Sequence, residues 1–391
     1  MKKNSLIIFK WPNYLNKYLI SKFSNFYNVE SLYLTDYKKE NFSEIIDHIN
    51  QTIISKNVNI VFFDVDFMKF INFFFIQKIE KNVKKILVTY DDYALHEMNA
   101  ITANACDLVL SQCPLSVLKY KEKGYEAYFM PPENDGAMFK NYNLEKKIDV
   151  LFFGQVRADR RDFIDFLTKN GISVKTVGDG SGWVDDNELF KLISKSKIVL
   201  NFSKSLGSTV ASYMSEDVYK FHYHLKGRII QSGLCGTLCV SEYSPGQEVI
   251  FNENDLPTFQ SKEECLDILK RFLDDEELLK KSTINFCSKV SNLYEEKKNF
   301  EPIYKAIDKK HNKKVELANI PYWYLRIVAK QIIIRNIKLS NIVTNIFQFK
   351  EIFQIIKNSN FKSKLLILLE SLINIIWYSI YSSIKNRKKN T

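Results

Sequence analysis

Lysine and arginine side chains cluster at two places where a helix is expected to begin. Cations oppose the dipole at a helix N-terminus, so their presence indicates an anion held jointly by side chains and free backbone N–H groups. Guanidinium groups suit phosphate because they donate paired hydrogen bonds. The pattern predicts a diphosphate site, although a solvated charged turn would also explain the first cluster. The cations are Arg157, Arg160 and Arg161 in the first cluster and Lys226 and Arg228 in the second.

Further polar and glycine positions follow expected strands and would complete this site. Gly154 directly follows an apolar run and lets the backbone approach a ligand. Gln231 lies one turn beyond Arg228 on the same helix face, where it could reach a sugar hydroxyl. The other candidates are Lys204, which follows Asn201 and Ser203, and the loop positions Ser244, Gly246 and Glu248. A plain turn capped by Glu248 is the alternative for that loop.

Carboxylates stand at the ends of two expected strands in the first half of the chain. Asp91 and Asp92 are candidates for a catalytic base that activates a hydroxyl, and helix capping is the alternative for Asp92. His96, one helical turn later, is a second choice for the base. Asp64 and Asp66 form a D-x-D pair that could hold Mg²⁺ or Mn²⁺, but they lie far in sequence from the arginines, and we expect no metal site.

Several enzyme classes are disfavoured by missing motifs. The sequence has no G-x-x-x-x-G-K-[ST] loop, no G-x-S-x-G elbow and no H-E-x-x-H pair, which argues against P-loop NTPases, α/β-hydrolases and zinc proteases. The six cysteines are scattered without a C-x-x-C pair, and the N-terminus does not resemble a secretory signal. We therefore expect reduced thiols and a cytoplasmic location.

The elements that must position these residues follow an alternating pattern. Short apolar runs alternate with amphipathic stretches of helix length, which predicts parallel sheets covered by helices. Pro131 and Pro132 interrupt the pattern, and it resumes after a polar connector. Two successive Rossmann-like halves are the simplest account. The expected strands are 5–10, 29–34, 58–65, 85–90, 108–111 and 127–130, then 149–153, 173–177, 198–202 and 237–241.

Three segments resemble the nucleotide-sugar-dependent glycosyltransferases of the GT-B fold, and specifically the spore maturation protein B-type branch. They are DVLFFGQVRADRRDF from Asp149, KGRIIQSGLCGTLCVSEYSPGQEVIF from Lys226, and the helical run 262–293. The family pattern R-V-F-E-A-L-A-C-G matches at Arg228, Cys235 and Gly236, whereas Gln231 replaces the acidic residue suited to the donor ribose. A glutamine can still accept a hydrogen bond there, but without a charge.

The resemblance implies an α/β protein with two Rossmann-like domains facing a cleft. We expect an acceptor domain over 1–132, a connector over 133–147, a donor domain over 148–300 and a basic helical extension over 301–391. The enzyme would transfer a sugar from a nucleotide-diphosphate sugar to a glycan or glycolipid acceptor in cell-surface polysaccharide or glycolipid biosynthesis. It would need no metal and no cofactor, because cations, Arg228 among them, and helix dipoles would stabilise the departing diphosphate.

Charge is distributed unevenly along the 391 residues. Residues 303–391 contain 17 Lys and Arg against 4 Asp and Glu, a net charge of +13, while the remainder carries −2. This distribution argues against a nucleic-acid groove in the main body and predicts that the tail meets an anionic surface. The apolar run 365–384 is interrupted by polar residues, so we expect it to lie on the inner face of the cell membrane rather than to span it. A soluble helical cap is the alternative.

Two other functions stay open at this stage. A nucleotide-sugar epimerase on the same scaffold would convert the donor without an acceptor. A membrane-associated scaffold that has lost its chemistry is the non-enzymatic alternative, and Gln231 at the expected acidic position favours it.

Overall fold

The computed structural model covers the whole chain and contains two compact units. Unit 1 comprises residues 1–110, 120–127 and 309–391, and unit 2 comprises 111–119 and 128–308, so the division runs through two strands and one helix. The structure describes residues 2–10, 12, 14–37, 42–65, 71–90, 92–131, 139–156, 158–178, 182, 184–204, 223–309, 320–337, 365–371 and 373.

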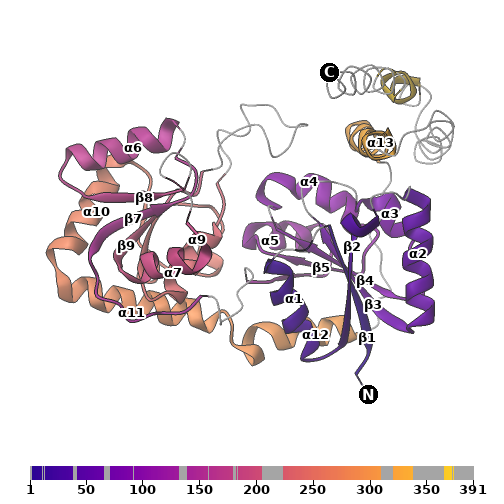
Figure 1. The fold of residues 1–391 in the computed structure, drawn as a ribbon, viewed down its shortest axis with the longest axis horizontal. Coiled ribbons are helices and arrows are strands. Elements are labelled where there is room, and N and C mark those ends of the chain that lie inside the picture. Colours follow the sequence, from indigo (N-terminus) through magenta and orange to yellow (C-terminus); the bar gives the residue numbers. More distant parts are fainter. Residues whose placement is uncertain are drawn as a thin grey trace, which may run out of the picture. The chain divides into compact units, whose positions relative to one another are not determined.

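The first sheet has six strands in the order β2-β1-β3-β4-β5-β6, and the pairs β1–β2, β1–β3 and β3–β4 are parallel (Figure 1). Apolar runs predicted these strands to within about a residue at each end, because central parallel strands are buried on both faces. The strands are β1 (Asn4–Phe9), β2 (Asn28–Tyr33), β3 (Val58–Val65), β4 (Lys84–Thr89), β5 (Leu108–Ser111) and β6 (Ala127–Phe129). The helices between them are α1 (Tyr14–Ser24), α2 (Phe42–Ser55), α3 (Phe73–Gln77), α4 (Asp92–Ala103) and α5 (Pro114–Glu122).

The second sheet is wholly parallel, with five strands in the order β11-β10-β9-β7-β8. Its strands are β7 (Ile148–Phe153), β8 (Val174–Val177), β9 (Ser196–Asn201), β10 (Leu238–Glu242) and the short edge strand β11 (Thr258–Phe259), which the sequence pattern did not reveal. Its helices are α6 (Ala158–Lys169), α7 (Asp186–Ser194), α9 (Gly227–Leu234), α10 (Lys262–Asp274) and α11 (Glu276–Asn292). The two predicted Rossmann-like halves are thus confirmed.

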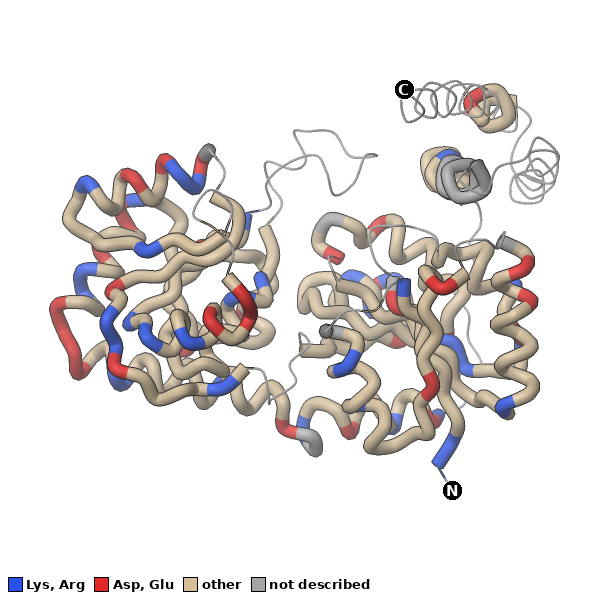
Figure 2. Tube along the Cα trace, viewed as in Figure 1, with Lys and Arg blue, Asp and Glu red and all other residues tan. Residues whose placement is uncertain are grey.

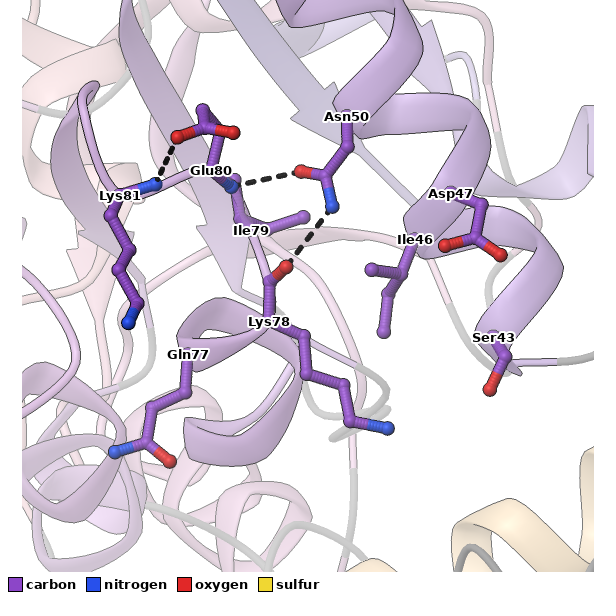
Figure 3. A pocket seen from close by; sticks show the side chains of 9 residues that line it. All are labelled: Ser43, Ile46, Asp47, Asn50, Gln77, Lys78, Ile79, Glu80 and Lys81. Carbon is purple, nitrogen blue, oxygen red and sulfur yellow. Dashed lines mark hydrogen bonds between the residues drawn. The ribbon is translucent and has the colours of Figure 1, made fainter.

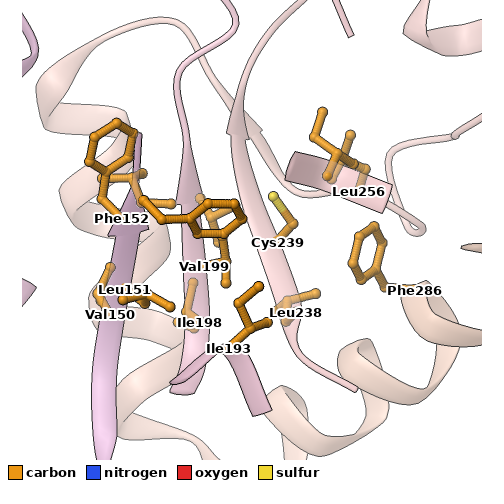
Figure 4. Close-up of a cluster of buried hydrophobic side chains, with 14 of the residues drawn as sticks. Val150, Leu151, Phe152, Ile193, Ile198, Val199, Leu238, Cys239, Leu256 and Phe286 are labelled. Atoms are coloured by element: carbon orange, nitrogen blue, oxygen red, sulfur yellow. The ribbon is translucent and has the colours of Figure 1, made fainter. Parts of the chain in front are cut away.

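The core of the second sheet is built from aliphatic and aromatic side chains on β7, β9 and β10 (Figure 4). Phe152, Ile198 and Cys239 lie in it with no exposed surface. On one flank, Gly233 of α9 faces Val290 of α11 so closely that a Cβ at Gly233 would lie 2.6 Å from Val290 Cγ2. A side chain there would push the two helices apart, so this glycine fixes the position of α9 and of the residues at its start.

The chain's last described helices are divided between the two units. Helix α12 (Glu301–Asp308) ends unit 2, and α13 (Tyr322–Ile337) lies in unit 1 with the short helical stretch 365–371. The Tyr324 hydroxyl, which is fully buried, accepts a hydrogen bond from Phe73 N at 2.8 Å and lies 2.9 Å from Thr102 Oγ1. No helix among the described residues is long and apolar enough to cross a bilayer. Acidic and basic residues are interspersed over the described parts of both units (Figure 2).

Candidate active site

In the second sheet the strand order reverses between β7 and β9: β8 lies on one side of β7, and β9 and the later strands lie on the other. Ligands of open parallel sheets bind beyond the carboxyl ends of the strands at such a switch point. Gly154 follows β7, and Asn201 is the last residue of β9. Helix α9 begins nearby, and Lys226 at its N-cap position makes no side-chain capping hydrogen bond. The switch point therefore combines two strand ends with a helix N-terminus that its N-cap side chain leaves uncapped.

Arg228, in the first turn of α9, occupies this switch point. Its Nη1 donates to Asn201 Oδ1 at 2.8 Å, and its guanidinium stands 5.2 Å from the Phe152 ring centroid and 5.6 Å from that of Phe153. Burial, and then the positive charge of Arg160, lowers the pKa of Arg228. Among the described residues, Arg228 forms no ion pair with a carboxylate. A half-buried guanidinium without an anionic partner loses part of its hydration, and a bound anion would offset that cost.

Two glycines give Arg228 its room. Gly154 has φ +127°, and a Cβ there would lie 2.8 Å from Arg228 Nη2. Gly178, at the end of β8, has φ +123°, and a Cβ there would lie 2.5 Å from Gly154 O. Since φ in this region is unfavourable for other residues, backbone conformation and space both select glycine. The glycine predicted to admit a ligand at 154 also admits the arginine side chain.

Arg160 is the second cation of the site, and it is more deeply buried than Arg228. It is 7% exposed, and its Nη1 donates to Gln155 O at 2.9 Å, while Nη2 donates to Lys204 O at 3.3 Å. Lys204 N in turn donates to Glu242 Oε2 at 2.8 Å. Burial raises the pKa of Glu242, and Lys204 and Arg160 oppose that rise. The loops after β7, β9 and β10 are thereby tied together.

His224 and Lys226 bring further nitrogen atoms to the same place. Lys226 Nζ is in hydrogen-bonding contact with His224 Nε2, and His224 N donates to Ser203 O at 3.1 Å. Burial, together with Lys226, Arg228 and Arg160, holds the pKa of His224 well below its usual range. The imidazole is therefore neutral near pH 7 and adds no positive charge to the site. Sequence reasoning missed His224, whose only signal was its place two residues before Lys226.

The loop after β10 is shaped by its own side chains. Gln247 Oε1 accepts from Ser244 N at 3.0 Å, Glu248 Oε2 accepts from Gly246 N at 3.0 Å, and Gly246 has φ +90°. Ser244 is buried and Glu248 is exposed. The backbone N–H groups of Ser244 and Gly246, two of the candidate positions, therefore bond to side chains of the same loop. Gln247, which was not among the predicted residues, holds the turn.

Some predicted residues are not brought to the switch point. Helix α6 begins at Ala158, so Arg160 and Arg161 are consecutive residues of its first turn and point in different directions: Arg160 is buried and Arg161 is exposed. Gln231 is half-buried, and its side chain makes no hydrogen bond to any described residue. Arg157 lies outside the described residues.

The acidic candidates of the first sheet form a different kind of centre. Asp92, the first residue of α4, has no exposed surface; its carboxylate accepts from Thr89 Oγ1, from Asn99 Nδ2 at 2.7 Å and from Tyr120 OH at 3.1 Å. His96 is also buried, and its ring centroid lies 4.5 Å from that of Tyr120. These contacts hold the start of α4 in place. The catalytic role of Asp92 stays a prediction, and Asp91 lies outside the described residues.

No group of three or more metal-ligating side chains occurs in the described ranges, which include Asp64 but not Asp66.

A hollow of about 500 Å³ lies on unit 1 beside α2 and the segment that leads into the amino end of β4 (Figure 3). Asn50 closes one side of it, donating to Lys78 O at 3.1 Å and accepting from Glu80 N at 2.8 Å. It lies at strand beginnings, whereas parallel sheets bind ligands at strand ends.

Comparison with known sequences finds one family that matches part of the chain. Residues 157–292 match the sequence model of the family described as glycosyl transferase-like. No curated protein sequence matches the chain at a significant level.

Several solved structures share the fold at low sequence identity. HepE from Anabaena, in complex with UDP and glucose, aligns with a TM-score of 0.55 at 10% identity, over 78% of this chain and 99% of that one. Sucrose-phosphate synthase from Thermosynechococcus elongatus gives 0.54 at 9% identity, over 78% and 98%. An alpha-glucosyltransferase in complex with UDP and a 13-mer DNA gives 0.53 at 12% identity, over 79% and 100%. The chain therefore has the GT-B fold of these structures, and residues 157–292, which make up most of the second sheet's domain, match the glycosyl transferase-like family.

Proposed function

We propose that this protein is a glycosyltransferase that moves a sugar from a nucleotide-diphosphate sugar to a glycan or glycolipid acceptor of the cell surface, without a metal or other cofactor. The observation that carries the proposal is Arg228, a half-buried cation at the switch point of the second sheet without a carboxylate partner among the described residues. A nucleoside diphosphate has the charge that this position lacks. UDP is the first nucleotide to test, since HepE and the alpha-glucosyltransferase were both solved with UDP.

The chemistry required of the site is stabilisation of a leaving group. As the bond between the sugar and the diphosphate breaks, negative charge accumulates on the diphosphate oxygens. Arg228, Lys226 and the N-terminus of α9 offer positive potential there, fixed in advance by packing and hydrogen bonds. Preorganised donors of this kind contribute on the order of 10²–10³ in rate each. Such an arrangement can supply the electrostatic contribution that a metal ion makes in other transferases.

A thermal-shift screen tests donor binding directly, because a ligand that binds only the folded protein raises the melting temperature. The screen uses UDP, GDP, ADP and CMP and the corresponding nucleotide sugars. We expect one diphosphate series to stabilise the protein. Radiolabelled donor of that series is then incubated with glycan and glycolipid acceptors. If none of the nucleotides raised the melting temperature, the proposal would be contradicted.

The acceptor side is proposed from the first sheet and from the basic tail. Asp91 or Asp92, at the end of β4, would serve as the base that takes the proton of the acceptor hydroxyl. The stretch 365–373 exposes apolar side chains, and the tail around it is strongly basic, as an anionic membrane surface requires. The exposed residues are Leu365, Leu366, Leu369 and Ile373. Flotation with vesicles containing phosphatidylglycerol, compared with purely zwitterionic vesicles, tests this association at the inner face of the membrane.

An inactive scaffold is the second candidate, and Gln231 is the observation that favours it. This side chain stands where the resemblance implies an acid, and it is half-buried without a hydrogen bond to the described residues. A scaffold would bind nucleotide sugars without consuming them. Donor turnover, measured as release of the nucleoside diphosphate with and without acceptor, separates the two candidates.

A further inference from the structure

Arg228 is held by an amide, although carboxylates are the usual partners of buried arginines. Asn201 Oδ1 accepts from Arg228 Nη1 at 2.8 Å, and Asn201 has no exposed surface. An aspartate has nearly the same shape as an asparagine and would form a stronger, charge-assisted bond. The neutral side chain therefore orients the guanidinium without cancelling its charge.

The orientation of the Asn201 amide follows from its other hydrogen bonds. Asn201 Nδ2 donates to Ser203 Oγ at 3.1 Å and to Ser241 Oγ at 2.9 Å. Both hydroxyls give their own protons to Glu242 O, at 2.7 Å from Ser203 and 2.9 Å from Ser241. Each hydroxyl has one proton, so both must accept from Asn201. The amide nitrogen is fixed on the hydroxyl side, and the amide oxygen is turned toward Arg228.

The charged groups around Arg228 leave it without compensation. Arg160 of α6, with Lys226 and the neutral His224 before α9, faces the same place, and the Cys239 thiol of β10 lies behind it. Burial raises the pKa of Cys239 to about 12, so this thiol is protonated and adds no negative charge near pH 7. Each of these neighbours is neutral or positive. An anion must come from outside this set.

We propose that Asn201 is a positioning residue that aims the Arg228 guanidinium at the diphosphate of the donor while leaving its charge available. This inference rests on the proposed function, because it presupposes that Arg228 binds a diphosphate. It adds a requirement that donor binding alone does not impose: the partner of Arg228 must be an acceptor of hydrogen bonds and must be uncharged.

The test is a double-mutant cycle on the full-length protein, with UDP and inorganic pyrophosphate as probes. Dissociation constants are measured for the wild type, Asn201→Ala, Arg228→Ala and the double variant. We expect Asn201→Ala to weaken binding about tenfold when Arg228 is present and less than twofold when it is absent, since a tenfold change corresponds to about 1.4 kcal/mol. Equal losses in both backgrounds would assign Asn201 a merely structural role.

The charge requirement is tested with Asn201→Asp, which keeps the shape and adds a carboxylate beside Arg228. We expect this variant to lose more affinity than Asn201→Ala, about thirtyfold or more relative to wild type, yet to melt at a higher temperature than Asn201→Ala. If the loss of affinity came from structural damage alone, the variant with the weaker UDP binding would also have the lower melting temperature. An Asn201→Asp variant that binds UDP as tightly as wild type would overturn the proposal.

The outcomes separate this inference from the proposed function. If neither UDP nor pyrophosphate binds the wild-type protein, or if Arg228→Ala binds them normally, the diphosphate site itself is wrong. If Arg228→Ala abolishes binding and Asn201→Ala does not change it, only the positioning role is wrong. Asn170→Ala, an exposed asparagine at the end of α6, serves as the matched control and should bind UDP normally.

Discussion

Asp92 and Arg228 occupy equivalent places in the two sheets but have opposite surroundings. Each lies in the first turn of a helix near the carboxyl ends of parallel strands; Asp92 is buried and Arg228 is half-buried. Asp92 has the charge that a helix N-terminus favours, and it accepts hydrogen bonds from Thr89, Asn99 and Tyr120. Arg228 has the charge that a helix N-terminus disfavours, and its hydrogen-bond partner is an amide.

The difference distinguishes a structural centre from a binding centre. A buried charge that the fold itself satisfies contributes to stability and gains nothing from a ligand. A buried charge that the fold orients but does not neutralise lowers stability until an anion arrives. On this basis we expect the first centre to support α4 and the second centre to bind the proposed donor. Each of the following predictions tests one side of that comparison.

The largest effect is expected for Arg228→Ala. This variant removes the cation at the switch point, so UDP affinity and sugar transfer should both fall about hundredfold or more. The free energy of unfolding without ligand should hardly fall, because a poorly compensated buried charge is also lost. Isothermal titration calorimetry with UDP and denaturant unfolding measure the two quantities.

A matched arginine serves as the control for that variant. Arg271 of α10 is exposed and stands over the neighbouring Phe272 ring at 5.2 Å. Arg271→Ala should bind UDP normally. A loss of stability in Arg228→Ala with unchanged UDP affinity would reverse the comparison and make Arg228 the structural centre.

The second effect concerns Asp92→Ala in the first sheet. Three buried donors lose their acceptor, so the free energy of unfolding should fall by about 3 kcal/mol. Asp186→Ala, which removes an exposed acid from the first turn of α7, should cost about 0.5 kcal/mol. An Asp92→Ala protein of normal stability that binds donor but transfers no sugar would instead identify Asp92 as the catalytic base.

The third effect concerns Gly154→Ala, which crowds the Arg228 side chain. A Cβ at Gly154 would lie 2.8 Å from Arg228 Nη2, so we expect UDP affinity to fall about tenfold, equivalent to about 1.4 kcal/mol. Gly171→Ala introduces a similarly unfavourable φ of +90° at a position with nothing within 4 Å. Both variants should lose about 1 kcal/mol of stability, but only Gly154→Ala should lose affinity. Equal UDP affinities would show that the glycine is needed for backbone conformation alone.

Much of the fold could be predicted because apolar runs report burial directly. Residues 58–65 and 108–111 coincide with β3 and β5, and the expected 149–153 differs from β7 by one residue. Strand β11 could not be found in this way. It has only two residues, Thr258 and Phe259, and it pairs with β10 at the edge of the sheet. Periodicity needs four or more residues to be recognised.

The site was predicted in part, for a different physical reason. Cations placed against a helix dipole and the family resemblance both pointed to Arg228, and the structure brings Arg160 and Lys226 close to it. Sequence spacing could not show that Arg161 faces solvent, since that depends on where α6 begins. Nor could it show how the Asn201 amide is oriented, because that depends on Ser241, which is distant in sequence and adjacent only across the β9–β10 pair.

The smallest effect is expected for Tyr324→Phe, which removes one buried hydrogen-bonding hydroxyl from unit 1. Burial raises the pKa of Tyr324 to about 12, so its hydroxyl keeps its proton near pH 7; it accepts from Phe73 N and pairs with Thr102 Oγ1. Removing it leaves a buried N–H without its acceptor, at a cost of about 1 kcal/mol. Tyr322→Phe, whose hydroxyl donates to Glu370 at 3.4 Å in a half-buried position, should cost less than 0.5 kcal/mol. UDP affinity should stay unchanged in both variants. If Tyr324→Phe bound UDP more weakly, hydrogen bonds in unit 1 would also affect the proposed binding centre at Arg228.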